Sequence, residues 1–567
     1  MSTADRPWLS SYAPGVPADI DVPEESLTDL LESSVARWPS ADALDFFGAT
    51  TTYAELGEQV SRAAEGLRAL GVSPGDRVAL VLPNCPQHVV AFYAVLRLGA
   101  VVVEHNPLYT ADELAHQLAD HGAQVVIAWD KTVETIRSVK ERTAVRIIVA
   151  VDLTAALPLK QRLMLRLPVA KARQAREAMS GPAGDAVRWS AIVGSRPLDP
   201  TSPRPSAGDT AVLQYTGGTT GVPKGAVLTH RNLRANAAQG RAWVPGLADG
   251  GEVVYGVLPL FHAYGLTLCL TFAMSIGAVL VLFPRFDADQ VLDAMVRRPA
   301  TFLPGVPPIY TALASGAPSR GVDLRSIRFA LSGAMPLPTD VVDHWESVTG
   351  GLLVEGYGMT ETSPITVGNP IAPSRRPGTV GVPFPSTQIR IVEPSDPSVD
   401  VEDGEPGELL VRGPQVMSGY WQRPDDTAQV LLDGGWMRTG DVVVMDDDGF
   451  ITVVDRIKEL IITGGFNVYP SEVEAALRRV PGVADAAAVG LPDGSGGERV
   501  VAAVVAETGV RLDPEEVRAS VRAHLTGYKV PRQVFVMDAL PTSMIGKVLH
   551  RQVRQHLLDH PDRRIAE

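Results

Sequence analysis

Segments typical of strands and of helices alternate along the first four hundred residues of this chain. Arg77–Leu82 is typical of a strand, His88–Leu98 has apolar residues at helical spacing, and Val101–Val103 is again typical of a strand. The capping box Thr110–Glu113 predicts a helix that begins at Ala111, and a further strand is predicted at Gln124–Ala128. This alternation predicts an α/β fold of parallel or mixed sheets covered by helices.

The pattern changes after Asp455. The remaining residues, about 110, match the usual size of one domain. They predict a compact α+β module with helices at Glu472–Arg479 and Glu515–Leu525 and strands at Ala484–Gly490 and Arg499–Ala506. We therefore expect a large N-terminal domain over residues 1–454 and a small C-terminal domain over residues 455–567.

Bulk composition excludes several classes of protein. With 45% hydrophobic and 20% charged residues, the chain can form a large core. Its net charge of −14 argues against general nucleic-acid binding, which depends on a basic surface. Two cysteines, Cys85 and Cys269, are too few for a disulfide framework or a cysteine-based zinc site. The N-terminus lacks the pattern of a secretory signal, so a cytoplasmic location is expected.

One uncharged segment, Leu266–Phe283, has the length of a membrane span. Ser275 and Gly277 divide it into a helix-like part and a strand-like part at Ala278–Phe283. Buried elements of large α/β proteins have this composition, so we expect an interior helix and strand rather than a span.

A second unusual segment, residues 158–177, mixes six basic side chains with leucine, methionine and valine. Pro168 should kink or split any helix there. Two interpretations stay open. The segment either forms a solvated helical insertion on its own domain, or it makes peripheral contact with an anionic membrane surface, such as the inner face of the cell membrane.

Residues 215–225, Tyr-Thr-Gly-Gly-Thr-Thr-Gly-Val-Pro-Lys-Gly, are the segment most informative about chemistry. Glycines let backbone N–H groups approach an anion, threonine hydroxyls add donors, and Lys224 adds a positive charge. The apolar Ala211–Leu213 before it is typical of a strand. We therefore expect a polyphosphate-binding loop at the edge of a sheet.

This loop is not a Walker A motif, which requires Gly before its Lys and Ser or Thr after it. Here Pro223 precedes Lys224 and Gly225 follows it. An ordinary mobile surface loop is the plain alternative, and the rest of the chain argues against it.

Further segments carry chemically suitable residues in loops and at the ends of apolar runs. Each taken alone has a structural explanation, because isolated His, Lys and Asp residues are usually core or solvated residues. Their joint occurrence in one order is what indicates a common site: Leu258–His262, Ser332–Pro336, Glu355–Glu361, Trp436–Asp441 and Pro541–Lys547.

In this order the motifs resemble those of the acyl-adenylate-forming superfamily, which includes acyl-CoA synthetases, peptide-synthetase adenylation domains and luciferases. The resemblance extends from about Leu27 to His556. The subgroup most similar is the bacterial long-chain fatty-acid–CoA ligases, on the basis of Asn106–Thr110, Gly419–Pro424, Gly465–Pro470 and Tyr528–Arg532.

The resemblance implies a reaction in two halves that uses ATP, Mg²⁺ and coenzyme A. A fatty-acid carboxylate attacks the α-phosphate of ATP, and the coenzyme A thiol then attacks the acyl-adenylate and releases AMP. By the resemblance, Lys547 bridges the carboxylate and the phosphates, while Glu361 and Thr216 hold Mg²⁺. The residues it assigns to ATP are Thr216, Gly217, Gly218, Thr219, Thr220, Gly221, Lys224, Gly333, Ala334, Glu355, Gly356, Tyr357, Gly358, Thr360, Asp441, Arg456 and Lys547.

The resemblance also implies an acyl pocket and a moving domain. His262 would lie near the acyl carboxylate as a catalytic residue that gates the pocket, together with Ala263, Gly265 and Leu266. The C-terminal domain would rotate about Lys458 between the half-reactions, withdrawing the Lys547 side chain and bringing in the coenzyme A loop of Gly464 and Gly465.

Other functions stay open at this point. A medium-chain or aryl-acid CoA ligase, or an adenylating enzyme that loads a carrier protein, would use the same motifs. A kinase would transfer the γ-phosphoryl group and release ADP, and a non-catalytic nucleotide or lipid binder would require a degenerate site. Neither the acyl-chain length nor the oligomeric state follows from the sequence.

Overall fold

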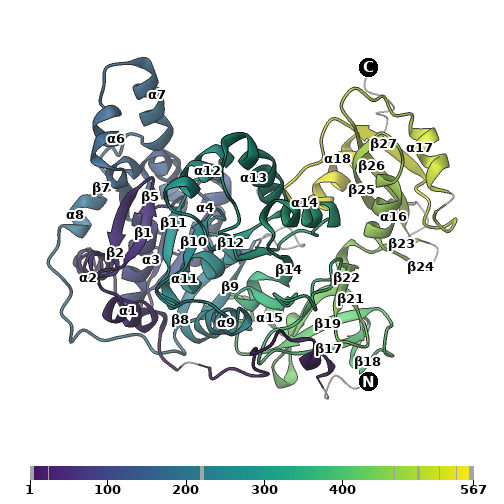
Figure 1. Ribbon diagram of the computed structural model, residues 1–567, viewed down its shortest axis with the longest axis horizontal. Helices are drawn as coiled ribbons and strands as arrows, with labels where there is room; N and C mark the ends of the chain where they lie inside the picture. Colours follow the sequence, from purple (N-terminus) through teal and green to yellow (C-terminus); the bar gives the residue numbers. More distant parts are fainter. Residues whose placement is uncertain are drawn as a thin grey trace. The chain divides into compact units, whose positions relative to one another are not determined.

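The computed structural model describes residues 6–22, 24–216, 223–463, 466–493, 498–522, 524–543 and 546–560. Contacts divide the chain into two compact units (Figure 1). The large unit consists of Trp8–Gln388 and Val411–Met437. The small unit consists of Met1–Pro7, Ile389–Leu410 and Arg438–Glu567.

One sheet of the large unit has the strand order β7-β6-β5-β3-β4-β8-β9. Its strands pair in parallel, except that β9 is antiparallel to β8 and ends the strand order. Its strands are β3 (Arg77–Val81), β4 (Val101–Glu104), β5 (Val125–Trp129), β6 (Ile147–Val151), β7 (Val187–Arg188), β8 (Thr210–Thr216) and β9 (Lys224–Thr229). The loop predicted from the sequence therefore connects β8 to an edge strand.

A second sheet of the large unit has the order β16-β15-β14-β13-β12-β10-β11-β1-β2. Its central strands are parallel, and antiparallel strands close both ends. The strands are β1 (Asp42–Phe46), β2 (Ala49–Thr52), β10 (Val253–Gly256), β11 (Val279–Leu282), β12 (Phe302–Gly305), β13 (Phe329–Ser332), β14 (Leu353–Gly358), β15 (Ile365–Gly368) and β16 (Val382–Pro383).

Helices alternate with these strands and cover the sheets (Figure 1). Leu114 and Leu118 of α4, for example, pack with Ala79 and Val126 of the first sheet in one buried cluster. The helices are α1 (Leu27–Arg37), α2 (Tyr53–Ala69), α3 (Pro86–Arg97), α4 (Ala111–His121), α5 (Val133–Val139), α6 (Leu159–Met164), α7 (Ala170–Met179), α8 (Trp189–Val193), α9 (His230–Trp243), α10 (Ala263–Gly265), α11 (Phe272–Ser275), α12 (Ala288–Arg297), α13 (Pro307–Arg320), α14 (Thr339–Thr349) and α15 (Pro424–Val430).

A third sheet has the order β18-β17-β19-β21-β20, with β22 paired to β21. Most of its residues belong to the small unit. Its strands are β17 (Gln388–Glu393), β18 (Asp396–Asp400), β19 (Gly407–Arg412), β20 (Leu431–Leu432), β21 (Trp436–Met445) and β22 (Ile451–Arg456).

The C-terminal part of the small unit contains a sheet of order β25-β26-β27 that is buried on both faces. Ala486 and Ala488 belong to one apolar cluster, and Ala487 and Val489 belong to the other, as the two-residue period of a strand requires. The elements are β23 (Ile461–Thr463), β24 (Phe466–Val468), α16 (Pro470–Arg478), β25 (Val483–Pro492), β26 (Glu498–Ala506), α17 (Pro514–Val521), β27 (Gln533–Met537) and α18 (His550–Asp559).

The α/β fold predicted from the sequence is confirmed. Thr110 caps α4 in a capping box with Glu113, so the helix begins at Ala111 as predicted. Pro168 lies between α6 and α7, which are separate helices. The predicted boundary at residue 454, between the N-terminal domain and a mobile C-terminal domain, stays a prediction.

The apolar segment Leu266–Phe283 forms a π-helix (Leu266–Thr271), α11 and the buried strand β11, as its composition indicated. Among the helices that the structure describes, none is long and apolar enough to span a bilayer.

Candidate functional site

The hairpin of β8 and β9 holds the two ends of the glycine-rich loop. Thr216 pairs with Lys224 in the antiparallel register, so both predicted phosphate ligands lie at one end of the hairpin. The Tyr215 hydroxyl donates to Asp120 Oδ2 at 2.6 Å, and Arg423 donates to the other oxygen of this carboxylate at 2.9 Å. The loop is therefore fixed at its base. Gly217, Gly218, Thr219, Thr220 and Gly221 lie outside the described residues.

The Lys224 ammonium group lies between an acid and an aromatic ring. It forms an ion pair with Asp426 of α15, and its Nζ lies 5.4 Å from the centre of the Tyr420 ring. The Tyr420 hydroxyl donates to Glu361 Oε1 at 2.8 Å. Burial, followed by the negative charge of Glu361, raises the pKa of Tyr420, so this hydroxyl keeps its proton and stays a donor. The sequence assigned no role to Tyr420 or Asp426.

Glu361 lies in the short 3₁₀ helix Thr360–Thr362, and its side chain is only 7% exposed. Carboxylate and hydroxyl oxygens, such as those of Glu361 and Thr216, are the hard donors that Mg²⁺ prefers, and Mg²⁺ commonly binds to one or two carboxylates together with substrate phosphates. Within the described ranges, no three His, Cys, Asp or Glu side chains gather as a ready metal site. The donors present therefore fit a magnesium ion that arrives with a polyphosphate.

The carboxyl ends of β13 and β14 bring two more predicted segments side by side. Ser332 pairs with Glu355 in the parallel register, so Gly333 and Ala334 follow one strand while Gly356 and Tyr357 continue the next. Ligands of open α/β sheets bind at this edge. Ala334 has a φ of 64°, in the left-handed region that L-residues seldom adopt.

Two features of β14 follow from its packing. A Cβ on Gly358 would lie 1.9 Å from the Pro364 carbonyl oxygen, so only glycine fits there. Burial raises the pKa of Glu355 to about 8. The hydrogen bond that its carboxylate accepts from the Leu337 backbone N–H lowers the pKa, but this effect is the smaller of the two. Glu355 is therefore mostly protonated near pH 7, and it would not repel an anionic nucleotide.

His262 caps the short helix α10. Its Nδ1 accepts a hydrogen bond from the Tyr264 backbone N–H at 3.3 Å, and burial lowers its pKa, so the imidazole is neutral near pH 7. A Cβ on Gly265 would lie 2.1 Å from the Pro259 carbonyl oxygen, which makes glycine necessary for this turn. Ala263 and Leu266 are buried beside it, at 2% and 0% exposure.

The small unit carries the remaining predicted site residues. Asp441 and Arg456 are paired across β21 and β22, and Arg456 Nε lies 3.0 Å from Asp441 Oδ1. Asp441 is only 4% exposed. Lys458 is exposed in the 3₁₀ helix Ile457–Glu459, directly after β22. Gly464 and Gly465 lie outside the described residues.

Lys547 lies in a tight turn before α18. Its backbone N–H donates to Ser543 Oγ at 3.1 Å, and its carbonyl accepts from the Ser543 N–H at 2.7 Å. Burial, followed by the positive charge of Arg456, lowers the pKa of Lys547. Arg456 thus lies near both Asp441 and Lys547 within the small unit.

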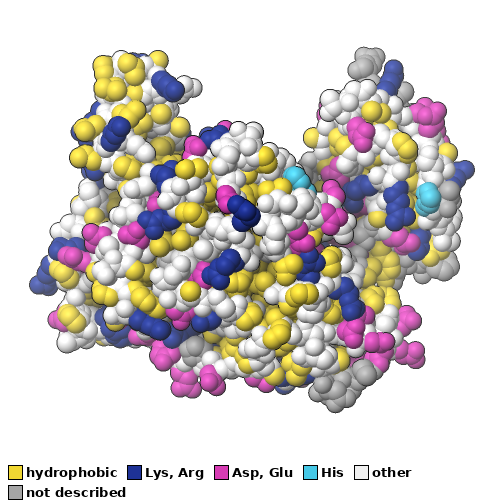
Figure 2. Space-filling model, viewed as in Figure 1, with side chains coloured by type: hydrophobic (Ala, Val, Ile, Leu, Met, Phe, Trp, Pro, Cys, Tyr) yellow, Lys and Arg dark blue, Asp and Glu magenta, His cyan; other side chains and the backbone are white. Residues whose placement is uncertain are grey.

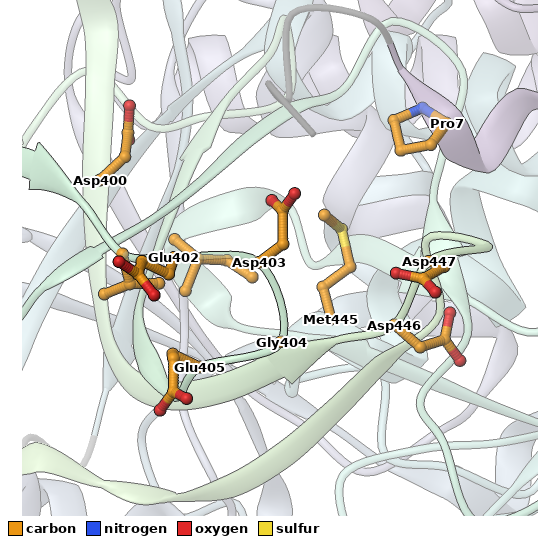
Figure 3. A pocket seen from close by; sticks show the side chains of 11 residues that line it. Pro7, Asp400, Glu402, Asp403, Gly404, Glu405, Met445, Asp446 and Asp447 are labelled. Carbon is orange, nitrogen blue, oxygen red and sulfur yellow. The ribbon is translucent and has the colours of Figure 1, made fainter.

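A pocket elsewhere in the small unit has a different character. Figure 3 shows acidic side chains around it, which disfavour a polyphosphate ligand. None of its lining residues was predicted from the sequence. The acidic residues are Asp400, Glu402, Asp403, Glu405, Asp446 and Asp447.

Comparisons with known proteins agree with this arrangement. The family model of AMP-binding enzymes matches residues 31–421, and that of the AMP-binding enzyme C-terminal domain matches residues 472–547. A long-chain-fatty-acid–CoA ligase of Escherichia coli O157:H7 is 40% identical over 552 residues, 96% of this chain and 97% of that protein. A feruloyl-CoA synthase of an Amycolatopsis species is 38% identical over 518 residues, 91% of this chain and 96% of that protein.

A comparison of the fold with solved structures gives a consistent result. The crystal structure of ATP-bound MatB from Rhodopseudomonas palustris has a TM-score of 0.80 and 30% identity, covering 94% of this chain and 99% of that chain. These matches extend over both units and nearly the whole length of the chain. The protein belongs to the AMP-binding enzyme family, the acyl-adenylate-forming enzymes that its motifs resemble.

Proposed function

We propose that this enzyme is an AMP-forming long-chain fatty-acid–CoA ligase. A carboxylate oxygen of the acid attacks the α-phosphorus of ATP, the bond from that phosphorus to the bridging oxygen breaks, and acyl-adenylate and pyrophosphate form. The coenzyme A thiol then loses its proton and attacks the acyl carbon, and AMP leaves. The observation that carries the proposal is the 40% identity to an enzyme named for this substrate, over 96% of this chain and 97% of that enzyme.

Two lysines would overcome the repulsion between the acid and the triphosphate. Lys224, at the base of the glycine-rich loop, suits the β- and γ-phosphates, with the backbone and hydroxyls of Thr216 and of residues 217–221. Lys547 suits the bridge between carboxylate and phosphate, because a partly buried ammonium group without strong hydration binds an anion tightly. Thr360 would reach the α-phosphate.

A magnesium ion bound with ATP would neutralise phosphate charge. Glu361 and Thr216 are the residues that would hold it, in keeping with their oxygen donors. Tyr420 would orient the Glu361 carboxylate through the hydrogen bond at 2.8 Å.

Nucleoside recognition would use residues that the motifs assign to ribose and to adenine. Asp441 would accept hydrogen bonds from the ribose hydroxyls, and Arg456 would hold the Asp441 carboxylate in place through their ion pair. Gly333, Ala334 and Tyr357 would flank the adenine, with Glu355, Gly356 and Gly358 completing this part of the site. His262, Ala263, Gly265 and Leu266 would line the acyl pocket.

The thioester half-reaction would use a second placement of the C-terminal domain. Lys458 is exposed at the end of β22, where a few backbone rotations would move everything that follows. Rotation about this residue would withdraw Lys547 and present Gly464 and Gly465 to coenzyme A.

An aryl-acid CoA ligase is the second candidate. The 38% identity to a feruloyl-CoA synthase favours it, because this value differs little from the identity to the fatty-acid ligase. Medium-chain acids and carrier-protein acceptors are further variants of the same chemistry.

We also propose that the enzyme works in peripheral contact with a membrane through residues 158–177. Its proposed substrate is lipophilic and partitions into bilayers, so a surface that holds the enzyme there would raise the local substrate concentration.

The test is acid-dependent exchange of labelled pyrophosphate into ATP, measured across short to long fatty acids and ferulic acid. We expect exchange to be fastest with long-chain acids, and added coenzyme A to yield AMP. Faster exchange with ferulic acid would favour the second candidate. Absence of exchange with every acid, or release of ADP, would contradict adenylate formation.

A further inference from the structure

The hairpin of α6 and α7 is the longest helical segment of the large unit, within the described residues, in which nothing is buried. No residue of either helix is buried, although helices of a folded domain normally bury one face. Figure 1 shows the two helices standing out from the sheets and helices of the large unit. The hairpin is therefore an unpartnered surface.

Apolar side chains are concentrated on this hairpin. Of the large apolar side chains that are exposed in the described part of the chain, five lie within eleven residues, and each is at least half exposed. Figure 2 shows them as a group of hydrophobic atoms interspersed with basic ones. They are Leu159 (69%), Leu163 (55%), Met164 (53%), Leu167 (52%) and Val169 (51%).

Basic side chains surround these apolar residues. Residues 158–177 contain six basic side chains and one acidic side chain, in a protein whose net charge is −14. All six are exposed, and within the described residues none forms an ion pair: Lys160, Arg162, Arg166, Lys171, Arg173 and Arg176.

Several other surface arginines of the large unit are paired. Arg320 forms ion pairs with Asp289 and Asp293, and Arg142 forms one with Asp112. The cations of the hairpin thus form no ion pair within the described part of the protein, and an external anionic surface would supply the counter-charge that one acidic residue cannot.

The base of the hairpin is firmly attached. Leu157 is 6% exposed, Trp129 Nε1 donates to the Met179 carbonyl at 2.8 Å, and the Ser180 hydroxyl donates to Asp130 Oδ2 at 2.6 Å. The exposed residues are thus held outward by a fixed base.

We infer that this hairpin binds the surface of an anionic lipid bilayer. The apolar residues 159–169 would enter the boundary between headgroups and acyl chains, and the six cations would lie among anionic headgroups. Cations lie among and directly after these apolar residues along the chain, which favours an anionic surface over the uncharged groove of a partner protein. The inference deepens the peripheral contact proposed above and does not depend on which acid is activated.

The experiment is co-sedimentation of the full-length enzyme with lipid vesicles. We expect binding to vesicles that contain about 30% phosphatidylglycerol and little binding to pure phosphatidylcholine, with a loss of binding when salt is raised to about 0.5 M. Leu163→Glu combined with Leu167→Glu should weaken binding about tenfold. Val296→Glu, on α12, is the matched control, because Val296 is 69% exposed and lies outside the hairpin; it should bind like the wild type.

A second pair of variants tests the charge. Arg166→Gln with Arg173→Gln should weaken binding, whereas Arg142→Gln with Arg320→Gln removes the same charge from paired positions and should have a much smaller effect. Equal binding to neutral and anionic vesicles, or unaltered binding of both hairpin variants, would overturn the inference. Absence of binding to any of the vesicles would also overturn the inference. An acidic protein would then be the alternative partner of the hairpin.

Pyrophosphate exchange with a water-soluble acid is measured for every variant. Unaltered exchange shows that the hairpin variants are folded. If the wild type binds vesicles but shows no exchange with any acid, long-chain acids included, the proposed reaction fails and the membrane surface stands.

Discussion

Lys224 in the large unit and Lys547 in the small unit are both proposed to contact the anionic substrates, yet their surroundings differ. Lys224 already has a counter-charge in Asp426 and an aromatic neighbour in Tyr420. Lys547 forms no ion pair within the described residues, and burial together with nearby Arg456 disfavours its charged form. On this proposal the first lysine would exchange a carboxylate for a phosphate, whereas the second would gain a strong counter-charge when the substrates bind.

This difference predicts how much each lysine contributes. A cation that is poorly stabilised in the free enzyme gains most when negative charge develops beside it, so its interaction is stronger in the transition state than before binding. A cation that is already paired gains less. Loss of Lys547 should therefore cost more than loss of Lys224.

The largest effect is expected from Lys547→Ala. Pyrophosphate exchange should fall roughly 10²- to 10³-fold, while thioester formation from pre-made acyl-adenylate should change little. Lys529→Ala is the control, because Lys529 is a lysine of the same unit whose Nζ pairs with Glu472 at 2.7 Å. Comparable losses in both half-reactions would show that Lys547 has no special role in adenylation.

A smaller effect is expected from Lys224→Ala. The KM for ATP should rise about tenfold, because one charge-assisted contact to phosphate is lost. Asp426→Asn should lower the KM for ATP slightly, since it frees Lys224 from its partner. A rise in KM with Asp426→Asn as large as that with Lys224→Ala would mean that the ion pair itself is required, and the comparison would fail.

Asp441→Ala should raise the KM for ATP several-fold, with a smaller change in kcat, through loss of hydrogen bonds to the ribose. Asp447→Ala, an exposed aspartate on the same hairpin, is the matched control. Steady-state kinetics with varied ATP measure both. An unchanged response to nucleotide would remove Asp441 from the site.

The smallest effect concerns Glu355 of the large unit, whose pKa of about 8 lies above its ordinary value of 4.5. Between these values the folded protein retains a proton that the unfolded chain has lost, so the free energy of unfolding should decrease as pH rises from about 4.5 to 8. Glu355→Gln should lessen this decrease, because the amide does not titrate. Urea unfolding at pH 5 and pH 8 measures it, and identical slopes in both proteins would contradict the buried, protonated state.

Local signals predicted the elements well. The capping box at Thr110 located the start of α4, Pro168 separated α6 from α7, and the small residues near Gly277 separated a buried helix from β11. Each of these signals depends on a few neighbouring residues, which is why one sequence suffices to recognise it.

Contacts between distant segments were not predictable in the same way. Lys224 and Asp426 are 202 residues apart, and Tyr420 and Glu361 are 59 residues apart. Sheet topology brings them together, and no local pattern indicates which acid will reach which lysine. The segment around Tyr420 served only to identify a subgroup, and its position beside Lys224 and Glu361 emerged from the structure.

The π-helix after His262 has a consequence of its own. A π-turn contains one more residue than an α-turn, so deletion of a single residue from Leu266–Thr271 would convert this turn to an α-turn, and the later side chains of the helix would keep their directions. Phe272 would stay against Phe302, whose ring centre lies 4.7 Å from its own, and only the side chains within Leu266–Thr271 would shift. Because these residues follow His262 of the proposed acyl pocket, we expect the deletion to alter which acids support pyrophosphate exchange and to leave the KM for ATP nearly unchanged.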